Sequence, residues 1–362
     1  MPSPTAATGI GSASLGRPSN LMGRFVPPEQ DNVKPLFSAV LGALTWSGGG
    51  PTELQLDLLQ SLLNAFAQET PQVVREFSPS SPETARAELG DTLLLEQCVN
   101  LVTILEFTMH PLPVGLEKHA EQYLHELGTE PRFLDILRDT SEDHMLRLHA
   151  DLMRNSWYTE QTIKGIFTGH IEELLRSKLA YYSIGRDEAL AAKWEGLRDC
   201  PEGSWGHGVA QFYEIHEFAF PGEPTGIYEI GALHDWVHVL TDYDTSPEGE
   251  IDVFAFIAAT MDDPRGFTQF IFTLALFQNA SITTVGGKEV MIARADTLSD
   301  AGASDHLADA FWRAAQCTAD PMGGVDHFAL ANTPLQELRE RWNIPPKTHP
   351  SPGALDSPSK NS

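Results

Sequence analysis

Apolar residues recur along most of this chain at the three- and four-residue spacing of amphipathic helices. One such stripe is formed by Leu54, Leu58, Leu59, Leu62 and Leu63, and Pro51, Thr52 and Glu53 mark the start of its helix. Similar patterns predict helices over residues 91–107, 114–127, 142–156, 160–181 and 186–197. Sustained period-two alternation is missing, and residues 282–294, with Gly286 and Gly287 as a turn, are the one hairpin candidate. The pattern predicts a mostly α fold.

Composition divides the chain into two helical halves with polar tails. Residues 1–32 and 347–362 are rich in Pro, Ser, Gly and Asn, so we expect both to be disordered. The loop at 199–204 interrupts the helical pattern. With 362 residues, of which 41% are apolar, the chain is long enough for two domains. We therefore predict helical domains over 33–155 and 156–346.

The charge of the chain restricts its partners. Fifty acidic residues face only 24 Lys and Arg, which gives a formal net charge of −26, and the basic residues are scattered. Such a surface repels nucleic-acid phosphates and anionic lipid head groups. We therefore expect no nucleic-acid partner and, at most, peripheral contact with a membrane.

Cysteine usage and the N-terminus bear on location. Cys98, Cys200 and Cys317 stand far apart, which disfavours a disulfide framework and a Cys-based zinc site and fits a reducing compartment. The longest apolar stretch, 267–277, is too short to span a bilayer and predicts a buried helix. Residues 1–28 lack a secretion signal but contain arginines and no acid, a faint likeness to an organellar transit peptide. We expect a cytoplasmic protein, or a mitochondrial one in a eukaryote.

Four residues in the second half have the spacing of a metal site. His234 and His238 are four positions apart, so on a helix both imidazoles lie on one face, one turn apart. The turn formers of 239–249 then allow the chain to reverse, so that Glu250 begins a new helix and points back at the histidines. Asp235 is a further ligand or orients an imidazole. We expect Trp236, Val237 and Leu240 to anchor the helix in the core.

This donor set suits a divalent metal, with zinc preferred and Fe(II), Mn(II) or Mg(II) as alternatives, and it leaves room for water or substrate. Chance is the competing explanation, because thirteen histidines are available and His-x-x-x-His arises readily in helices. Other pairs, such as His119 with His125 or His144 with His149, have uninformative spacings.

Three segments together resemble a known family. They are the His234-Asp235-x-x-His238 motif followed by Gly249-Glu250, the stretch 197–212 (LRDCPEGSWGHGVAQF) and the stretch 334–346 (PLQELRERWNIPP). In this order they are similar to the Coq-four family, the zinc-associated coenzyme Q biosynthesis proteins, over about residues 140–346. The chain departs from that pattern at Gly231, Phe254, Ile257 and Thr260, where the family usually carries Arg, Lys, Glu and Gln.

The resemblance implies a helical bundle with an apolar cavity that binds a prenyl lipid, and a role in ubiquinone assembly alongside other quinone-biosynthesis enzymes. It also implies a lyase-like or oxidative decarboxylase activity, in which the ring carboxyl group is replaced by hydroxyl. A metal held by the four residues would polarise the ring carboxylate, with His234 and Asp235 as catalytic residues. We expect a homo-oligomer. The wall for the prenyl tail would come from Phe254, Phe256, Phe267, Phe270, Phe272 and Phe277, whose alternative role is ordinary core packing.

Residues 33–155 resemble the helical layout of TerB-like (tellurite-resistance) domains, without the acidic Asp-Gly loops of that family. This resemblance implies a packing or partner-binding module, and an ordinary helical bundle is the alternative.

Two other functions stay open. A non-catalytic lipid-binding scaffold is favoured by the apolar residues at Gly231, Phe254 and Ile257. A phosphohydrolase built on a His-Asp doublet would use His234 and Asp235, and would also need partners such as His207 or His216 and Asp296.

Overall fold

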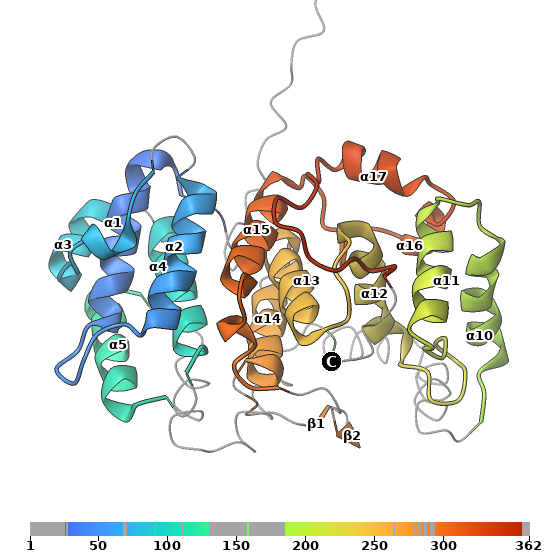
Figure 1. Ribbon diagram of the computed structural model, residues 1–362, viewed down its shortest axis with the longest axis horizontal. Helices are drawn as coiled ribbons and strands as arrows, with labels where there is room; N and C mark the ends of the chain where they lie inside the picture. The colour runs from blue at the N-terminus through green and yellow to red at the C-terminus, as the bar shows by residue number, and fades with distance from the viewer. Residues whose placement is uncertain are drawn as a thin grey trace, which may run out of the picture.

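The computed structural model describes residues 26, 28–67, 71–90, 92–109, 112–129, 158, 185–263, 265–278, 280, 284–285, 288–289 and 294–356. Over these residues the protein is mostly helical, as the sequence predicts (Figure 1). One short hairpin interrupts the helices, because β1 (Thr284–Val285) pairs antiparallel with β2 (Lys288–Glu289). This hairpin lies where the sequence predicts it.

The N-terminal half is a small bundle built around its first helix. Its elements are α1 (Gln30–Leu44), α2 (Glu53–Phe66), η1 (Val74–Glu76), α3 (Pro82–Leu89), α4 (Thr92–Glu106) and α5 (Val114–Glu126). Helix α1 packs against α3, α4 and α5. Gly42 permits this, since a Cβ there would lie 2.2 Å from the Ser80 carbonyl oxygen. The predicted start of α2 is confirmed: Thr52 and Gln55 form a reciprocal capping box.

The C-terminal half surrounds a helix that is buried on all sides. Its elements are α10 (Glu188–Glu195), η2 (Gly196–Asp199), α11 (Trp205–Ile215), α12 (Glu229–Thr241), α13 (Pro247–Thr260), α14 (Arg265–Phe277), η3 (Thr297–Ser299), α15 (Ala303–Gln316), α16 (His327–Leu330) and α17 (Leu335–Arg341). Every residue of α13 from Ile251 to Thr260 is buried, and α13 packs against α12, α14 and α15. Its sides therefore face different neighbours.

The two halves contact each other through α2 and α15. The Ser61 hydroxyl donates to an Asp305 carboxylate oxygen at 2.6 Å, and the buried apolar residues of both halves belong to one cluster. The predicted helices over 142–156 and 160–181 lie outside the described residues, apart from Tyr158 at their edge. The boundary between domains 33–155 and 156–346 therefore stays a prediction.

The expectation of disordered tails is wrong at both inner edges. Residues 30–32 already belong to α1. Residues 347–356 follow a defined path in which Ala354 is buried and Lys347 makes three hydrogen bonds to backbone carbonyls. Residues 1–25 and 357–362 lie outside the described residues. Composition misled the prediction because a few specific bonds, and not the average polarity, hold this segment.

Among the described residues, none of the helices has the length and apolar character needed to cross a membrane. The most apolar stretch forms α14, which has 13 residues and is almost wholly buried, as the sequence predicts.

Candidate metal centre

Helix α12 carries three of the four predicted site residues, His234, Asp235 and His238. As expected, Trp236, Val237 and Leu240 anchor it, because each is fully buried. The indole N–H of Trp205 also donates to the Trp236 carbonyl at 2.8 Å and ties α12 to α11. Helix α12 is therefore held in the core through these residues, and its histidine-bearing side faces α13.

The chain reverses after α12 and places Glu250 opposite the histidines, as predicted. Asp242 ends α12 in the left-handed conformation (φ 65°), and Ser246 caps α13 through a bond from the Gly249 N–H. Gly249 is needed for this close turn, since a Cβ there would lie 2.2 Å from Asp244 Oδ1 and 2.3 Å from the Asp244 carbonyl oxygen. Glu250 consequently lies in the first turn of α13.

Two imidazoles and one carboxylate converge at this point. His238 Nε2 lies 3.4 Å from Glu250 Oε1, and His234 Nε2 lies 3.9 Å from Glu250 Oε2. One nitrogen or oxygen of each of the three residues lies within 4.8 Å of the others. We call this group, His234, His238 and Glu250, the first cluster.

Backbone carbonyls orient both imidazoles of the first cluster. His234 Nδ1 lies 2.6 Å from the Gly231 carbonyl oxygen, and His238 Nδ1 lies 3.0 Å from that of Tyr243. A carbonyl only accepts, so each Nδ1 donates, and in the neutral imidazole each Nε2 keeps its lone pair on the side of Glu250. This is the usual arrangement behind metal-bound histidines.

The donors of the first cluster are of a kind that metal ions accept, and His238 is the most buried of them. Its side chain is fully buried, and its Nε2 atom has no hydrogen-bond partner. A buried nitrogen with a free lone pair is costly unless something binds it. Two imidazoles and a carboxylate are the donors that Zn²⁺ or Fe(II) accepts.

Asp235, predicted as a further ligand, lies beside the first cluster but is not one of its three candidate ligands, and it is held from the other side. Its Oδ1 lies 3.3 Å from His234 Nε2, whereas its Oδ2 accepts a 2.5 Å hydrogen bond from the Tyr213 hydroxyl. Tyr213 is itself buried and stacks on Phe220. Sequence reasoning missed Tyr213, because only the packing of α11 on α12 brings it to Asp235.

The charges of the site influence one another strongly. Burial alone would raise the pKa of Glu250, but His238 and His234 outweigh it and lower that pKa. Burial likewise opposes protonation of His238, yet the nearby Glu250 carboxylate raises its pKa. Burial raises the pKa of Asp235 against the opposing effect of His234. Burial also raises the pKa of Tyr158, helped by Tyr228 and by the charges of Asp235 and Glu250, so this phenol belongs to the same environment.

Phenyl rings cover the imidazoles. Phe254, one turn beyond Glu250, stacks on His234 with ring centroids 5.4 Å apart, and Phe212 stacks on His238 at 5.6 Å. Of the other rings expected to form a ligand wall, Phe256, Phe267 and Phe270 are fully buried, and Phe270 packs on Phe311 of α15. Phe277 is also buried and Phe272 partly so. An apolar cavity beside the first cluster stays a prediction.

The residues that a His-Asp doublet hydrolase would need do not join His234 and Asp235 as ligands, although His216 lies near enough to help lower the pKa of Glu250. His216 contacts the Ala354 carbonyl and Thr245, and Asp296 is exposed before η3. Neither these two residues nor His207 enters a group of candidate ligands in the described part of the chain.

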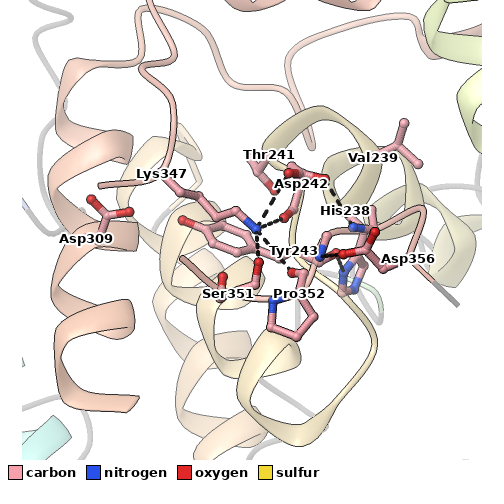
Figure 2. A network of polar contacts seen from close by, with 12 residues as sticks. His238, Val239, Thr241, Asp242, Tyr243, Asp309, Lys347, Ser351, Pro352 and Asp356 are labelled. Carbon is pink, nitrogen blue, oxygen red and sulfur yellow. Dashed lines mark hydrogen bonds and ion pairs between the residues drawn. The ribbon is translucent and has the colours of Figure 1, made fainter. Parts of the chain in front are cut away.

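The C-terminal segment supports the loop that orients His238 (Figure 2). Lys347 Nζ donates to the carbonyls of Asp242 (2.7 Å), Ser351 (2.8 Å) and Pro352 (3.1 Å). The Ala354 N–H also donates to Asp242 Oδ1. Because Tyr243 follows Asp242 directly, the segment expected to be disordered holds the carbonyl that orients His238.

The chain was also compared with protein-family models, with curated proteins and with solved structures, and none of the three comparisons found a match.

Proposed function

We propose that this protein is a metal-dependent enzyme acting on a prenylated aromatic ring, of the kind found in coenzyme Q biosynthesis. The observation that carries the proposal is the first cluster: two imidazoles, each fixed by a backbone carbonyl, direct their Nε2 atoms at one carboxylate. The likeness of three ordered segments to the Coq-four family supports the choice of substrate class.

The apolar surroundings also support a hydrophobic ligand. Phe254 lies against His234 where the resembling family usually carries a Lys, and Ile257 on the same helix is buried. A phenyl ring beside an imidazole favours an aromatic or prenyl group and disfavours a free anionic one. The ligand's ring would therefore lie against Phe254, with its polar substituent toward the first cluster.

His234, His238 and Glu250 would hold the metal, with zinc preferred. Bound there, a divalent ion would polarise a ring carboxylate or keto oxygen. Asp235, held by the Tyr213 hydroxyl, stands beside His234 Nε2 and can carry a proton at Oδ1. Phe254 limits the access of water to His234. Exchange of a ring carboxyl for hydroxyl is a two-electron oxidation that releases carbon dioxide, so it also requires molecular oxygen, which would accept the electrons and supply the hydroxyl oxygen.

A lipid-binding scaffold without catalysis is the second candidate. It is favoured by Gly231, Phe254 and Ile257, which replace polar residues of the resembling family. In that case the metal would stabilise α12 against α13, and the apolar residues would hold a lipid without converting it.

Metal analysis of the purified full chain tests the site that both candidates share. We expect His234→Ala and Glu250→Ala to lose the metal bound at the first cluster. His119→Ala is the matched control, because His119 also contacts a backbone carbonyl (Gly42, 3.1 Å) but lies in α5. Unchanged metal content in both site variants would refute the first cluster as a metal site.

Mass spectrometry of the lipid carried by the native protein then tests the ligand. A prenylated ring supports both candidates, and the absence of any such lipid contradicts both. Incubation of the metal-loaded protein with a prenylated hydroxybenzoate under oxygen separates them. Loss of carbon dioxide that depends on Asp235 indicates the enzyme, and retention of the unchanged ring indicates the scaffold.

A further inference from the structure

The opposite side of α13 carries a second group of potential ligands. Glu248 and Asp252 lie one turn apart on α13, and His306 of α15 faces them. One nitrogen or oxygen of each lies within 4.8 Å of the others. We call Glu248, Asp252 and His306 the second cluster. Figure 1 shows α13 between α12, which bears the first cluster's histidines, and α15.

The two clusters use different sides of one helix. Glu250 lies two positions from both Glu248 and Asp252, and residues two apart on a helix point in different directions. Glu250 therefore faces α12, whereas Glu248 and Asp252 face α15. The second cluster thus shares no ligand with the first.

Asp252 is the residue of the second cluster whose surroundings most favour a bound cation. Its exposed fraction is 1%, and its Oδ1 atom has no hydrogen-bond partner. Buried carboxylates are paired, hydrogen-bonded or bound to metal in nearly all proteins. The neighbouring cation, Arg313, makes no hydrogen bond to it: its Nε donates to the Pro345 carbonyl, and its guanidinium lies 5.0 Å from the Tyr243 ring centre.

His306 and Glu248 complete the group at its more accessible edge. His306 Nδ1 contacts a Glu248 carboxylate oxygen, and the ring also hydrogen-bonds to the backbone of Pro350. The side chains of His306 and Glu248 are 15% and 25% exposed, so an ion from solvent can reach them. The ring of His349 lies 6.3 Å from that of His306.

We propose that Glu248, Asp252 and His306 form a second divalent-cation site, which links α13 to α15. One imidazole and two carboxylates suit Mn²⁺ or Zn²⁺, and the ion would take the place of the proton between His306 Nδ1 and Glu248. The ion would satisfy Asp252 and offset the negative charge that Glu248, Asp244 and Asp309 bring to the same region. It would also fix the helix that presents Glu250 to the first cluster. The proposal does not depend on the proposed function.

Equilibrium dialysis of the full chain against Mn²⁺, with bound metal counted by atomic mass spectrometry, tests this site. Each of three variants should lose one equivalent of bound Mn²⁺: Asp252→Asn, Glu248→Gln and His306→Ala. The Mn²⁺ affinity of the second cluster should fall at least about 100-fold in each, which exceeds the usual effect of removing a residue that only supports a ligand. His238→Ala removes only the metal of the first cluster. If all three second-cluster variants bind as many equivalents of Mn²⁺ as the wild type, the proposal is wrong.

Asp320→Asn is the matched control for removing a buried carboxylate. Asp320 accepts hydrogen bonds from the N–H groups of Asp262, Met322 and Gly323, so its loss destabilises the fold without releasing metal. If Asp252→Asn fails to fold, the partly exposed Glu248 and His306 variants give the answer.

Thermal unfolding gives a second readout. Mn²⁺ raises the Tm of the wild type, and part of this rise is lost in each second-cluster variant. If Mn²⁺ neither binds through these residues nor changes the Tm through them, Glu248 and His306 form an ion pair only, and the site does not exist. Loss of metal in His238→Ala alone would leave the proposed function intact and refute only this inference. Loss of metal in the second-cluster variants but not in His238→Ala would support this inference and contradict the proposed function.

Discussion

The first and second clusters lie on two sides of α13 but are organised differently. In the first, backbone carbonyls fix both imidazoles and Tyr213 holds the neighbouring Asp235, so the donors are oriented before any ion binds. In the second, His306 and Glu248 already contact each other, while the Oδ1 atom of the buried Asp252 has no hydrogen-bond partner.

This difference indicates different tasks. Donors held by a surrounding shell, beside an aromatic ring, suit chemistry or ligand binding. Donors that join two helices and leave a buried carboxylate in need of a counter-charge suit a structural ion. The structure thus places a candidate reactive centre and a candidate stabilising centre on one helix, and substitutions can separate them.

The largest effect is expected from Gly249→Ala, which should damage both clusters together. A Cβ at this position would meet Asp244 Oδ1 and its carbonyl oxygen at 2.2 and 2.3 Å, so the first turn of α13 has to move. We expect the free energy of unfolding to fall by about 1–3 kcal/mol and metal binding to weaken at both clusters. Urea unfolding and equilibrium dialysis measure the two effects.

Gly196→Ala is the control for the glycine. No atom lies within 4 Å of a Cβ built at Gly196, and its backbone has right-handed helical geometry. Its stability and metal content should match the wild type. If Gly249→Ala also matched the wild type, the close approach of Asp244 would not determine the geometry of α13.

Tyr213→Phe should affect the first cluster alone. It removes the hydroxyl that holds Asp235 and leaves the buried ring in place, so metal affinity at the first cluster should fall about 10–100-fold. The second cluster should keep its affinity. Titration with Zn²⁺ in a Glu248→Gln background isolates the first cluster for this measurement.

Tyr123→Phe is the matched control, since Tyr123 is also buried and its hydroxyl donates to the Ser80 carbonyl at 3.0 Å, with Ser80 Oγ a further 3.4 Å contact. Each variant should lose roughly 1 kcal/mol of stability. Equal metal affinities in the two variants would show that Tyr213 only packs and does not position Asp235.

The sequence was sufficient for the first cluster because its residues are close along the chain. His234 and His238 share one helix, and the turn before Glu250 can be recognised from its residue types, so local rules place all of them within residues 234–250. The helical class follows from the same periodicity.

Contacts between distant elements could not be predicted in this way. His306 and Glu248 are 58 positions apart, and nothing in their surroundings indicates that α15 packs on α13. Tyr213 reaches Asp235 only through the packing of α11 on α12. Residues 347–356 have a composition typical of disorder, yet Lys347 and the buried Ala354 fix their path.

Lys347→Met gives the smallest effect of the three on metal affinity and tests whether the C-terminal segment supports the first cluster. The variant keeps the length of the side chain but loses three hydrogen bonds to the carbonyls of Asp242, Ser351 and Pro352. We expect stability to fall by roughly 1–2 kcal/mol, because bonds from a charged donor are stronger than neutral ones. Affinity at the first cluster should fall less than tenfold, since the Tyr243 carbonyl that orients His238 loses its support indirectly.

Lys34→Met removes a charge of the same kind from an exposed position, where the side chain only approaches the Phe77 ring at 6.0 Å. Its stability and metal affinity should stay near those of the wild type. Should Lys347→Met weaken the second cluster and spare the first, the segment would act through Pro350 and His306 instead of Tyr243 and His238. The C-terminal segment would then support the second cluster, on the α15 side of α13, and not the first cluster, on the α12 side.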